Sequence, residues 1–438
     1  MHFGRKAIRR RRELVHRAYY DDVTGAKNLF RVKLDAPEIM RKNPKACYAV
    51  VVVDVKDFQM FNDQYGFETG DVLLRTIAKT LEDTLDSAYE TSGRVEGDVF
   101  VILVALDDDG SLLDRENKLL TQLVQAAKDA VGRGVPFVMG SCIISHADAF
   151  TSSFENARFA HKHAKASGRV IAHYDDALKK IIQREKYLEN RMEQALVDGE
   201  FKLFLQPQYS VNDEVIESTE ALVRWIPPDG NMVYPDEFIP LFERNGFIQQ
   251  LDYFMFEQAC RKLKEWIDAG IEPVTIAVNF SRAHLDDPDW IPTLARTASI
   301  YKIPAGLLEI ELTERTAIEK ESELRAALSL IHAEGFKISI DDFGSGYSSL
   351  GALNVLEVDT LKLDKSFFDA GPDNKRMRAI VASVIRMAKQ LNMETVAEGI
   401  EEEEQVIFLR ELKCDKIQGY YYARPQPADD IVVLLRRQ

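Results

Sequence analysis

The sequence has no uninterrupted apolar stretch of the roughly 20 residues that a membrane-spanning helix needs, which disfavours an integral membrane protein. It also lacks a signal peptide, because the opening residues MHFGRKAIRRRREL are basic and contain no apolar central segment. We therefore expect a cytoplasmic location, with tethering through an upstream sensor segment left open. Residues 1–13 are expected to form a basic helix whose charged face is solvated rather than bound to a membrane.

Cysteine and net positive charge are also scarce. The four cysteines, Cys47, Cys142, Cys260 and Cys414, show no CxxC spacing, which indicates reduced core residues rather than disulfides or a zinc site. The formal net charge of −15 disfavours nonspecific binding to nucleic acid or to an anionic membrane. It does not exclude an anionic ligand in a local pocket or on a metal ion.

The chain has 438 residues, more than one ordinary core supports, so two domains are expected. Before about residue 180, the strand-like runs YAVVVVDV, DVFVILVAL and FVMGSCII are separated by helical stretches, which favours a modest α/β sandwich. After it, eight short strand-like runs alternate with helical segments, a pattern typical of a (β/α)8 barrel. These runs are FKLFLQP, EVIESTEALV, VTIAVNF, LLEIEL, FKISIDD, TLKLD, METVAEG and DKIQGY.

Polar residues stand at the ends of seven of these runs. They are Glu220, Asn279, Glu311, Asp341, Lys362, Glu398 and Gln418. Any one acid alone is adequately explained as a cap for the helix that follows its strand. Capping does not explain an acid, amide or lysine at so many successive strand ends, and a barrel brings these ends to one rim.

Several carboxylates on one rim repel each other unless a cation lies among them, so hard divalent ions such as Mg²⁺ or Mn²⁺ are expected. Asp341 and Asp342, at the end of FKISIDD, are candidate ligands. Two ions bridged by carboxylates suit phosphodiester hydrolysis, and Lys362 adds a positive charge beside the attacking water. A glycosidase also uses acids at a barrel mouth, but it needs one pair and no metal.

Seven motifs carry a family resemblance over about residues 188–438: ESTEALVRW, VNFS, ELTE, DDFGSGYSSL, DTLKLD, AEGIE and QGYYYARP. This part of the chain resembles EAL-type cyclic di-GMP phosphodiesterases. The resemblance implies metal ligands at Glu220, Asn279, Glu311, Asp341 and Glu398, with Asp342 at the second ion. It implies catalytic or supporting roles for Lys362, Glu220, Glu314 and Glu401. It also implies substrate-binding roles for Gln206, Leu222, Arg224, Asp364 and Gln418.

Residues from about 14 to 176 resemble a GGDEF domain, the fold of diguanylate cyclases, through DDVTGAKN, VDVKDFQMFNDQYGFETGD and AKASGR. The signature itself reads EGDVF: Glu96 replaces a glycine that lies close to the nucleotide phosphates, and Val99 replaces an active-site acid. The inhibitory RxxD motif is also absent, since Ser87 and Glu90 hold its positions. We expect no cyclase activity and no product feedback. A purely structural role for this domain is the favoured interpretation. A regulatory GTP site is left open at residues that still match the family: Asp54, Asn62, Asp71, Asp98, Lys165 and Arg169.

Taken together, the sequence predicts an α/β chain with a degenerate GGDEF domain at 14–176, a helical linker at 177–190 and an EAL domain with a modified TIM-barrel fold at 191–438. The expected activity is hydrolysis of cyclic di-GMP to linear pGpG with two Mg²⁺ or Mn²⁺ ions. The alternative is a receptor or scaffold that holds cyclic di-GMP without cleaving it. A homodimer through the EAL domain is expected from the family, in which the FGSGYSSL loop joins the metal site to the dimer contact.

Overall fold

The computed structural model describes residues 17–106, 111–314, 316, 321–344, 357–368 and 374–436. The basic segment 1–13 and the part of the FGSGYSSL loop beyond Gly344 lie outside these residues. The chain divides into two compact units, Met1–Arg184 and Glu185–Gln438. Among the described residues, no helix combines the length and apolar character needed to span a membrane.

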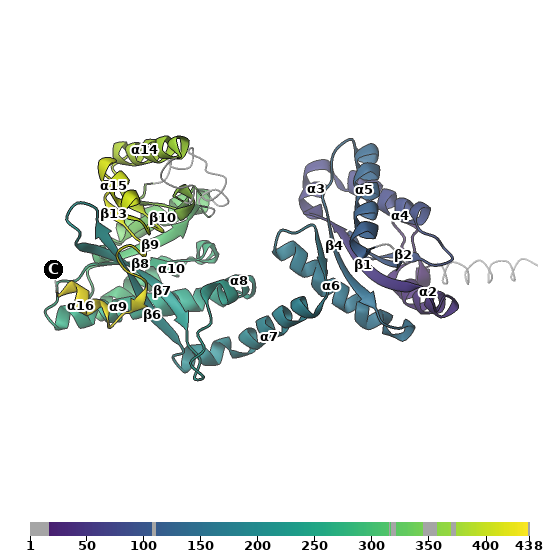
Figure 1. Cartoon of the computed structure of the whole chain (residues 1–438), viewed down its shortest axis with the longest axis horizontal. Helices are drawn as coiled ribbons and strands as arrows, with labels where there is room; N and C mark the ends of the chain where they lie inside the picture. Colours follow the sequence, from purple (N-terminus) through teal and green to yellow (C-terminus); the bar gives the residue numbers. More distant parts are fainter. Residues whose placement is uncertain are drawn as a thin grey trace, which may run out of the picture. The chain divides into compact units, whose positions relative to one another are not determined.

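The first unit is a five-stranded sheet with helices on both faces (Figure 1). The strands run in the order β2-β3-β1-β4-β5, and only β4 and β5 pair in parallel. Their bounds are β1 Cys47–Val55, β2 Thr91–Glu96, β3 Val99–Leu106, β4 Phe137–Ile144 and β5 Ile171–His173. The helices are α2 Leu29–Lys42, α3 Phe58–Tyr65, α4 Phe67–Thr84, α5 Leu112–Val131 and α6 Phe150–Ala166, with the 3₁₀ turn η1 at Ala147–Ala149.

The central strand β1 explains why both faces are covered. Val51 and Val53 pack into the core beside α4 and α5, whereas Val50 and Val52 pack into the core beside α2 and α6. A strand buried on both faces reads as a continuous apolar run, which is how CYAVVVVDV appears in the sequence. The expected α/β sandwich is confirmed.

The second unit is a closed barrel. Strands β6 to β13 pair in sequence order, and β13 pairs back onto β6, with β14 added outside β6. The strands are β6 Phe201–Ser210, β7 Ile216–Trp225, β8 Thr275–Asn279, β9 Leu308–Thr313, β10 Lys337–Phe343, β11 Thr360–Leu363, β12 Glu394–Ala397, β13 Lys416–Ile417 and β14 Gln426–Pro427. Strand β6 is antiparallel to all three of its partners, β7, β13 and β14, whereas β7 to β13 pair in parallel. This is the expected modified TIM barrel.

Helices follow most of these strands and cover the outside of the barrel (Figure 1). They are α8 Pro235–Asn245, α9 Ile248–Asp268, α10 Trp290–Tyr301, α12 Glu321–Ala333, α14 Lys375–Gln390, α15 Glu403–Glu411 and α16 Ile431–Leu435, with 3₁₀ turns η2 Arg282–Asp286, η3 Ala305–Leu307 and η4 Lys365–Phe367. One continuous apolar core fills the space between helices and strands.

The boundary between the two units, at Arg184 and Glu185, falls within one helix. Helix α7 runs without interruption over Asp176–Val197, and β6 begins at Phe201. Its sequence DALKKIIQREKYLENRMEQALV is rich in strong helix formers.

One expectation about the cysteines is wrong. All four are free, and Cys142, Cys260 and Cys414 are buried, but Cys47 is exposed. Cys47 is the first residue of β1, where the strand leaves the covered part of the sheet, so its side chain is not part of the core.

Candidate active site

The polar residues at the carboxyl ends of the barrel strands face the inside of the barrel. In β10, Ile338 and Ile340 pack into the outer core, so Asp341 lies on the inner side of the strand. The strand register places Asn279 beside Glu311 in the neighbouring pair β8 and β9. Side chains that are far apart in the sequence therefore meet at one mouth of the barrel.

Lys362 on β11 lies at the centre of this group, with its side chain 1% exposed. Its Nζ pairs with Glu311 Oε1 and lies 2.7 Å from Glu398 Oε1, 3.1 Å from Asp341 Oδ1 and 3.3 Å from Glu220 Oε2. One buried cation thus contacts carboxylates from four different strands or strand ends.

Two amides hold the carboxylate of Glu220 from other directions. Asn279 Nδ2 donates to Glu220 Oε1 at 2.9 Å, and Gln418 Nε2 donates to Glu220 Oε2 at 2.5 Å. Gln418 Nε2 also donates to Gln206 Oε1 at 3.1 Å. With its amino group on Glu220, Asn279 keeps its carbonyl oxygen as the group that can bind a cation.

The carboxylates around Lys362 outnumber this one cation, and several of them have raised pKa values. Burial, opposed by Lys362 and assisted by the neighbouring carboxylates, raises the pKa of Glu311 well above its usual value. Burial likewise raises the pKa of Glu398 to about 8 and, together with Asp341, that of Asp342 to about 6. Burial lowers the pKa of Lys362, but the surrounding acids outweigh it, so the lysine pKa is raised and the ammonium stays charged. Such a cluster attracts further positive charge.

Carboxylate oxygens come close enough together to hold metal ions in two groups. Oxygens of Glu220, Glu311 and Glu398 lie within 4.8 Å of one another, as do oxygens of Asp341, Asp342 and Glu398. Both groups contain Glu398. Carboxylates are the ligands that Mg²⁺ and Mn²⁺ prefer, so the donor set fits hard divalent ions.

The backbone at the end of β10 is unusual, because the register of the strand shifts between Ile340 and Phe343. Asp342 has a φ of 55°, in the left-handed region, and Gly344 has a φ of 98°. A side chain at Gly344 would collide with the ring of Phe367, so this position requires glycine. The backbone N–H of Gly344 donates to Glu314 Oε2 at 3.0 Å, which connects the predicted supporting acid to the start of the FGSGYSSL loop.

A cavity of about 550 Å³ opens beside the acids. Leu222, Arg224 and Asn279 line it together with Asp341 and Asp342. The Arg224 guanidinium lies over the ring of Phe204 at 5.7 Å, and burial lowers its pKa. The cavity thus combines an acidic cluster with an arginine, an arrangement that suits a phosphate ester on a cation.

Two predicted residues lie at the margin of this site. Asp364 caps η4 by accepting from Ser366 N–H at 3.0 Å, and its predicted contact with the substrate stays a prediction. Glu401 is exposed on the turn after β12, where its backbone N–H donates to Gln405 Oε1 at 2.9 Å. Within the described part of the chain, no hydrogen bond or ion pair joins the Glu401 side chain to the residues around Lys362.

Sequence reasoning missed two sets of residues behind the site. Gln208 and Ser218 are buried beneath Gln418, and the alternation in QPQYS, which puts Gln208 on the same face as Gln206, could have indicated this. Asp252 on α9 accepts from Ser281 N–H at 2.9 Å and contacts His284 Nε2 at 3.1 Å. No sequence signal links α9 to the VNFS turn.

In the first unit, Asn62, Asp98 and Lys165 line a second cavity of about 490 Å³. Asp54 is buried behind it, paired with Lys165 and 3.0 Å from His161 Nε2. Burial and the charge of Asp54 raise the pKa of Asp98, whose Oδ2 accepts from Val55 N–H at 3.0 Å.

The other two predicted residues of this unit lie elsewhere. Asp71 pairs with Arg75 on the exposed side of α4 at 3.4 Å, and Arg169 is exposed on the turn after α6. Neither lines the 490 Å³ cavity.

Comparison with known proteins assigns both units to families. The EAL domain model matches residues 189–425, and the model "Diguanylate cyclase, GGDEF domain" matches residues 18–170. The cyclic di-GMP phosphodiesterase NbdA of Pseudomonas aeruginosa is 33% identical over 430 residues, covering 96% of this chain and 54% of NbdA. The bifunctional diguanylate cyclase/cyclic di-GMP phosphodiesterase MucR of the same organism is 30% identical, covering 97% of this chain and 62% of MucR.

The chain therefore spans only about half to two thirds of the length of these relatives. Among solved structures, the PaMucR phosphodiesterase in complex with c-di-GMP is 33% identical with a TM-score of 0.54, covering 56% of this chain and 99% of that one. The Vibrio cholerae LapD S helix-GGDEF-EAL structure is 18% identical with a TM-score of 0.62, and the match covers 95% of this chain and 99% of the LapD chain. It shares the fold of this chain. The chain belongs to the EAL domain family, and its EAL domain follows a GGDEF domain.

Proposed function

We propose that the EAL domain hydrolyses cyclic di-GMP to linear pGpG. The observation that carries the proposal is the buried Lys362 surrounded by carboxylates, next to a cavity that also contains Arg224. The names of NbdA and MucR and the c-di-GMP bound to PaMucR support the substrate.

The metal part of the proposal is two Mg²⁺ or Mn²⁺ ions per site. Glu220, Asn279, Glu311, Asp341 and Glu398 would hold them, with Asp342 at the second ion, and the two carboxylate groups that share Glu398 support this assignment. When bound, such ions lower the pKa of a water molecule and neutralise charge on the phosphodiester oxygens.

The residues of the chain then have separate tasks. Lys362 holds the acids together and keeps a positive charge where the attacking water would lie. Arg224 would bind a phosphate oxygen, since a guanidinium matches phosphate geometry. Gln206, Leu222, Asp364 and Gln418 would contact other parts of the substrate. Glu314 holds the start of the FGSGYSSL loop through Gly344, and Glu401 would act from the turn after β12.

The test is turnover of cyclic di-GMP by the purified chain with Mn²⁺ and by its Glu220→Ala variant. We expect hydrolysis to fall about 100-fold or more, because the variant removes one metal ligand and one partner of Lys362. Glu217→Ala, an exposed glutamate on the same strand, is the matched control and should retain activity. Equal turnover by parent and Glu220→Ala would refute the assignment. Bound nucleotide that stays intact for hours with Mn²⁺ would favour the receptor or scaffold instead.

For the first unit, we propose a catalytically inactive GGDEF domain that acts as a GTP-responsive regulator. In EGDVF, Glu96 adds a negative side chain and Val99 removes an acid. The Glu220→Ala variant lacks the competing hydrolysis, so it is incubated with GTP and Mg²⁺. Accumulation of cyclic di-GMP would refute the inactivity of the GGDEF domain.

Further parts of the proposal are the boundaries 14–176, 177–190 and 191–438, a homodimer through the EAL domain and a cytoplasmic location.

A further inference from the structure

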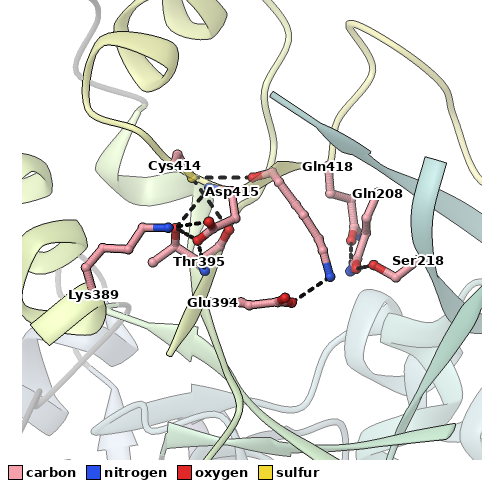
Figure 2. Close-up of polar contacts among 9 residues, drawn as sticks. Gln208, Ser218, Lys389, Glu394, Thr395, Cys414, Asp415 and Gln418 are labelled. Carbon is pink, nitrogen blue, oxygen red and sulfur yellow. Dashed lines mark hydrogen bonds and ion pairs between the residues drawn. The ribbon is translucent and has the colours of Figure 1, made fainter. Parts of the chain in front are cut away.

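We infer that Gln208 and Ser218 are positioning residues that fix the amide of Gln418 and, through it, the carboxylate of Glu220. The inference rests on the proposed function of the EAL domain and adds residues that lie below the predicted metal and substrate groups. Figure 2 shows Gln208 between Ser218 and Gln418, inside the barrel. All three side chains belong to buried residues: Ser218 is 0% exposed, Gln208 4% and Gln418 6%.

The barrel strands place these residues opposite one another. In the antiparallel pair of β6 and β7, Gln206 faces Glu220 and Gln208 faces Ser218. Strand β13, which ends just before Gln418, pairs with β6 on its other side. The two glutamines of β6 therefore lie between the strand that carries Glu220 and the strand that leads to Gln418.

The direction of each hydrogen bond follows from donor and acceptor chemistry. An ionised Glu220 can only accept, so Gln418 must turn its amino group toward Glu220 Oε2, at 2.5 Å, and toward Gln206 Oε1, at 3.1 Å. The carbonyl oxygen of Gln418 then points to the other side and needs a donor. Gln208 Nε2 supplies it at 2.8 Å.

The chain of bonds ends at a hydroxyl. Because the amino group of Gln208 is directed toward Gln418, the carbonyl oxygen of Gln208 faces Ser218 and accepts from Ser218 Oγ at 2.6 Å. Each of these links then has one allowed direction, from amide N–H or hydroxyl to oxygen. Without the Gln208 donor, the buried oxygen of Gln418 would lose its partner, and a reversed amide would place that oxygen against Glu220, where the two acceptors repel. Buried groups that orient a metal ligand in this way typically change metal affinity or activity by about 10- to 100-fold when removed.

The experiment uses the full chain, three single variants and a Gln418→Leu background. Gln208→Met keeps the side-chain length and removes the donor, and Ser218→Ala removes only the hydroxyl. Ser339→Ala is the matched control, since Ser339 is another fully buried serine of the barrel, and its Oγ has no hydrogen-bond partner among the described residues. We measure Mn²⁺ binding without nucleotide by electron paramagnetic resonance, kcat and KM for cyclic di-GMP, and the unfolding midpoint.

We expect Gln208→Met to weaken Mn²⁺ binding and to lower kcat by about 10-fold, with a smaller loss in Ser218→Ala and none in Ser339→Ala. In a Gln418→Leu background, Gln208→Met should cause little further change, because its effect passes through Gln418. Parent-like Mn²⁺ binding and kcat in folded Gln208→Met and Ser218→Ala would overturn the inference, as would equal losses in Ser339→Ala or additive losses with Gln418→Leu.

The inference can still be tested if a variant does not fold or if the parent shows no hydrolysis. If Gln208→Met does not fold, Ser218→Ala decides, because it removes one oxygen atom and adds no volume. If the parent binds Mn²⁺ but does not hydrolyse cyclic di-GMP, the proposed activity fails, and the order of Mn²⁺ affinities among the variants still supports or overturns the role of Gln208.

Discussion

At the scale of single residues, the EAL domain stabilises buried acids with one shared cation. Lys362 contacts Glu311, Glu398, Asp341 and Glu220, yet the pKa of Glu398 remains raised to about 8. A lysine can compensate part of this charge but not all of it. The remaining negative charge is the physical reason to expect divalent ions at the site.

A second buried acid, Glu116 on α5, belongs to the first unit and has no catalytic explanation. It is 0% exposed, and the basic side chain that the described residues place against it is His173, whose Nδ1 lies 3.6 Å from Glu116 Oε2. Burial raises the pKa of Glu116 above 4.5, and Ser141 and His173 offset this only in part. A raised pKa means that the folded state prefers the protonated acid.

We therefore predict that Glu116→Gln stabilises the first unit at neutral pH. In the parent, the stability linked to the protonated acid is fully present below about pH 4.5 and is lost as the pH rises through the folded pKa. The gain of Glu116→Gln over the parent should therefore be absent at low pH and reach about 1–3 kcal/mol at pH 7.5. The three tryptophans, Trp225, Trp266 and Trp290, lie in the barrel unit. Urea unfolding is therefore measured by both circular dichroism and tryptophan fluorescence. A transition that appears in circular dichroism but not in fluorescence reports the unfolding of the first unit.

The exposed Glu68 on α4 provides the control, since Glu68→Gln should leave the free energy of unfolding nearly unchanged. A Glu116→Gln variant that is equally or less stable at pH 7.5, or whose gain is largest at pH 4.5, would contradict the assigned direction.

Single residues differ in how far the sequence predicts them. Glu311 and Lys362 could be predicted because parallel strands place their ends at one rim, and the structure brings both together there. For Gln208, the alternation in QPQYS indicates only that the side chain faces inward. Its hydrogen bonds depend on Gln418 and Ser218, which other strands bring against it. The pairing of Asp54 with His161 depends on how α6 packs on the sheet, which no local pattern encodes.

At the scale of elements, the eight expected barrel runs correspond to β6 to β13, because each run alternates or ends in a recognisable turn. The antiparallel direction of β6 follows from the short turn that joins β6 to β7, because a parallel pair needs a crossover of a dozen or more residues. The alternation of strand and helix that predicts the barrel does not by itself give this direction. Strands β2 and β5 were not anticipated: β2 contains Gly93 and Arg94, and β5 has only three residues.

The two-residue strand β13 closes the barrel and depends on side chains for its position. Asp415, just before it, accepts from Thr395 N–H at 2.8 Å and from Thr395 Oγ at 2.9 Å, and it pairs with Lys389 (Figure 2). Within β13, Lys416 Nζ contacts Glu394 Oε2 at 2.8 Å. These bonds connect β13 to β12 where only two residue pairs form the ladder.

We predict that Asp415→Ala lowers the free energy of unfolding of the barrel unit by about 1–3 kcal/mol, because it leaves the Thr395 N–H without its partner. Urea unfolding monitored by tryptophan fluorescence measures the change. The control is Asp429→Ala, an exposed aspartate whose pair with Lys262 should contribute less than about 1 kcal/mol. Equal effects of the two substitutions would show that Asp415 does not anchor β13.

At the scale of the whole molecule, the chain joins a GGDEF domain with an altered signature to an EAL domain with a full set of acids. The two are connected by the single helix α7, and β6, which carries Gln206, begins at Phe201, soon after α7 ends at Val197. A ligand on the first unit can activate the EAL domain only if it binds more tightly when the EAL domain is in its active arrangement.

We predict that GTP lowers the KM or raises the turnover of cyclic di-GMP hydrolysis, by about 5-fold at saturation if the coupling is typical of allosteric pairs. Lys165 lies at the 490 Å³ cavity and pairs with Asp54, so triphosphate oxygens would compete with Asp54 for the ammonium. Lys165→Ala should abolish the response, whereas Lys162→Ala, an exposed lysine of the same helix, should retain it. Steady-state kinetics over a wide range of GTP concentrations and calorimetry on the same samples measure both effects. If GTP neither binds nor changes hydrolysis, the Lys165 ammonium is neutralised by Asp54 and does not bind phosphate. The GGDEF domain then acts as a spacer or a dimerisation element.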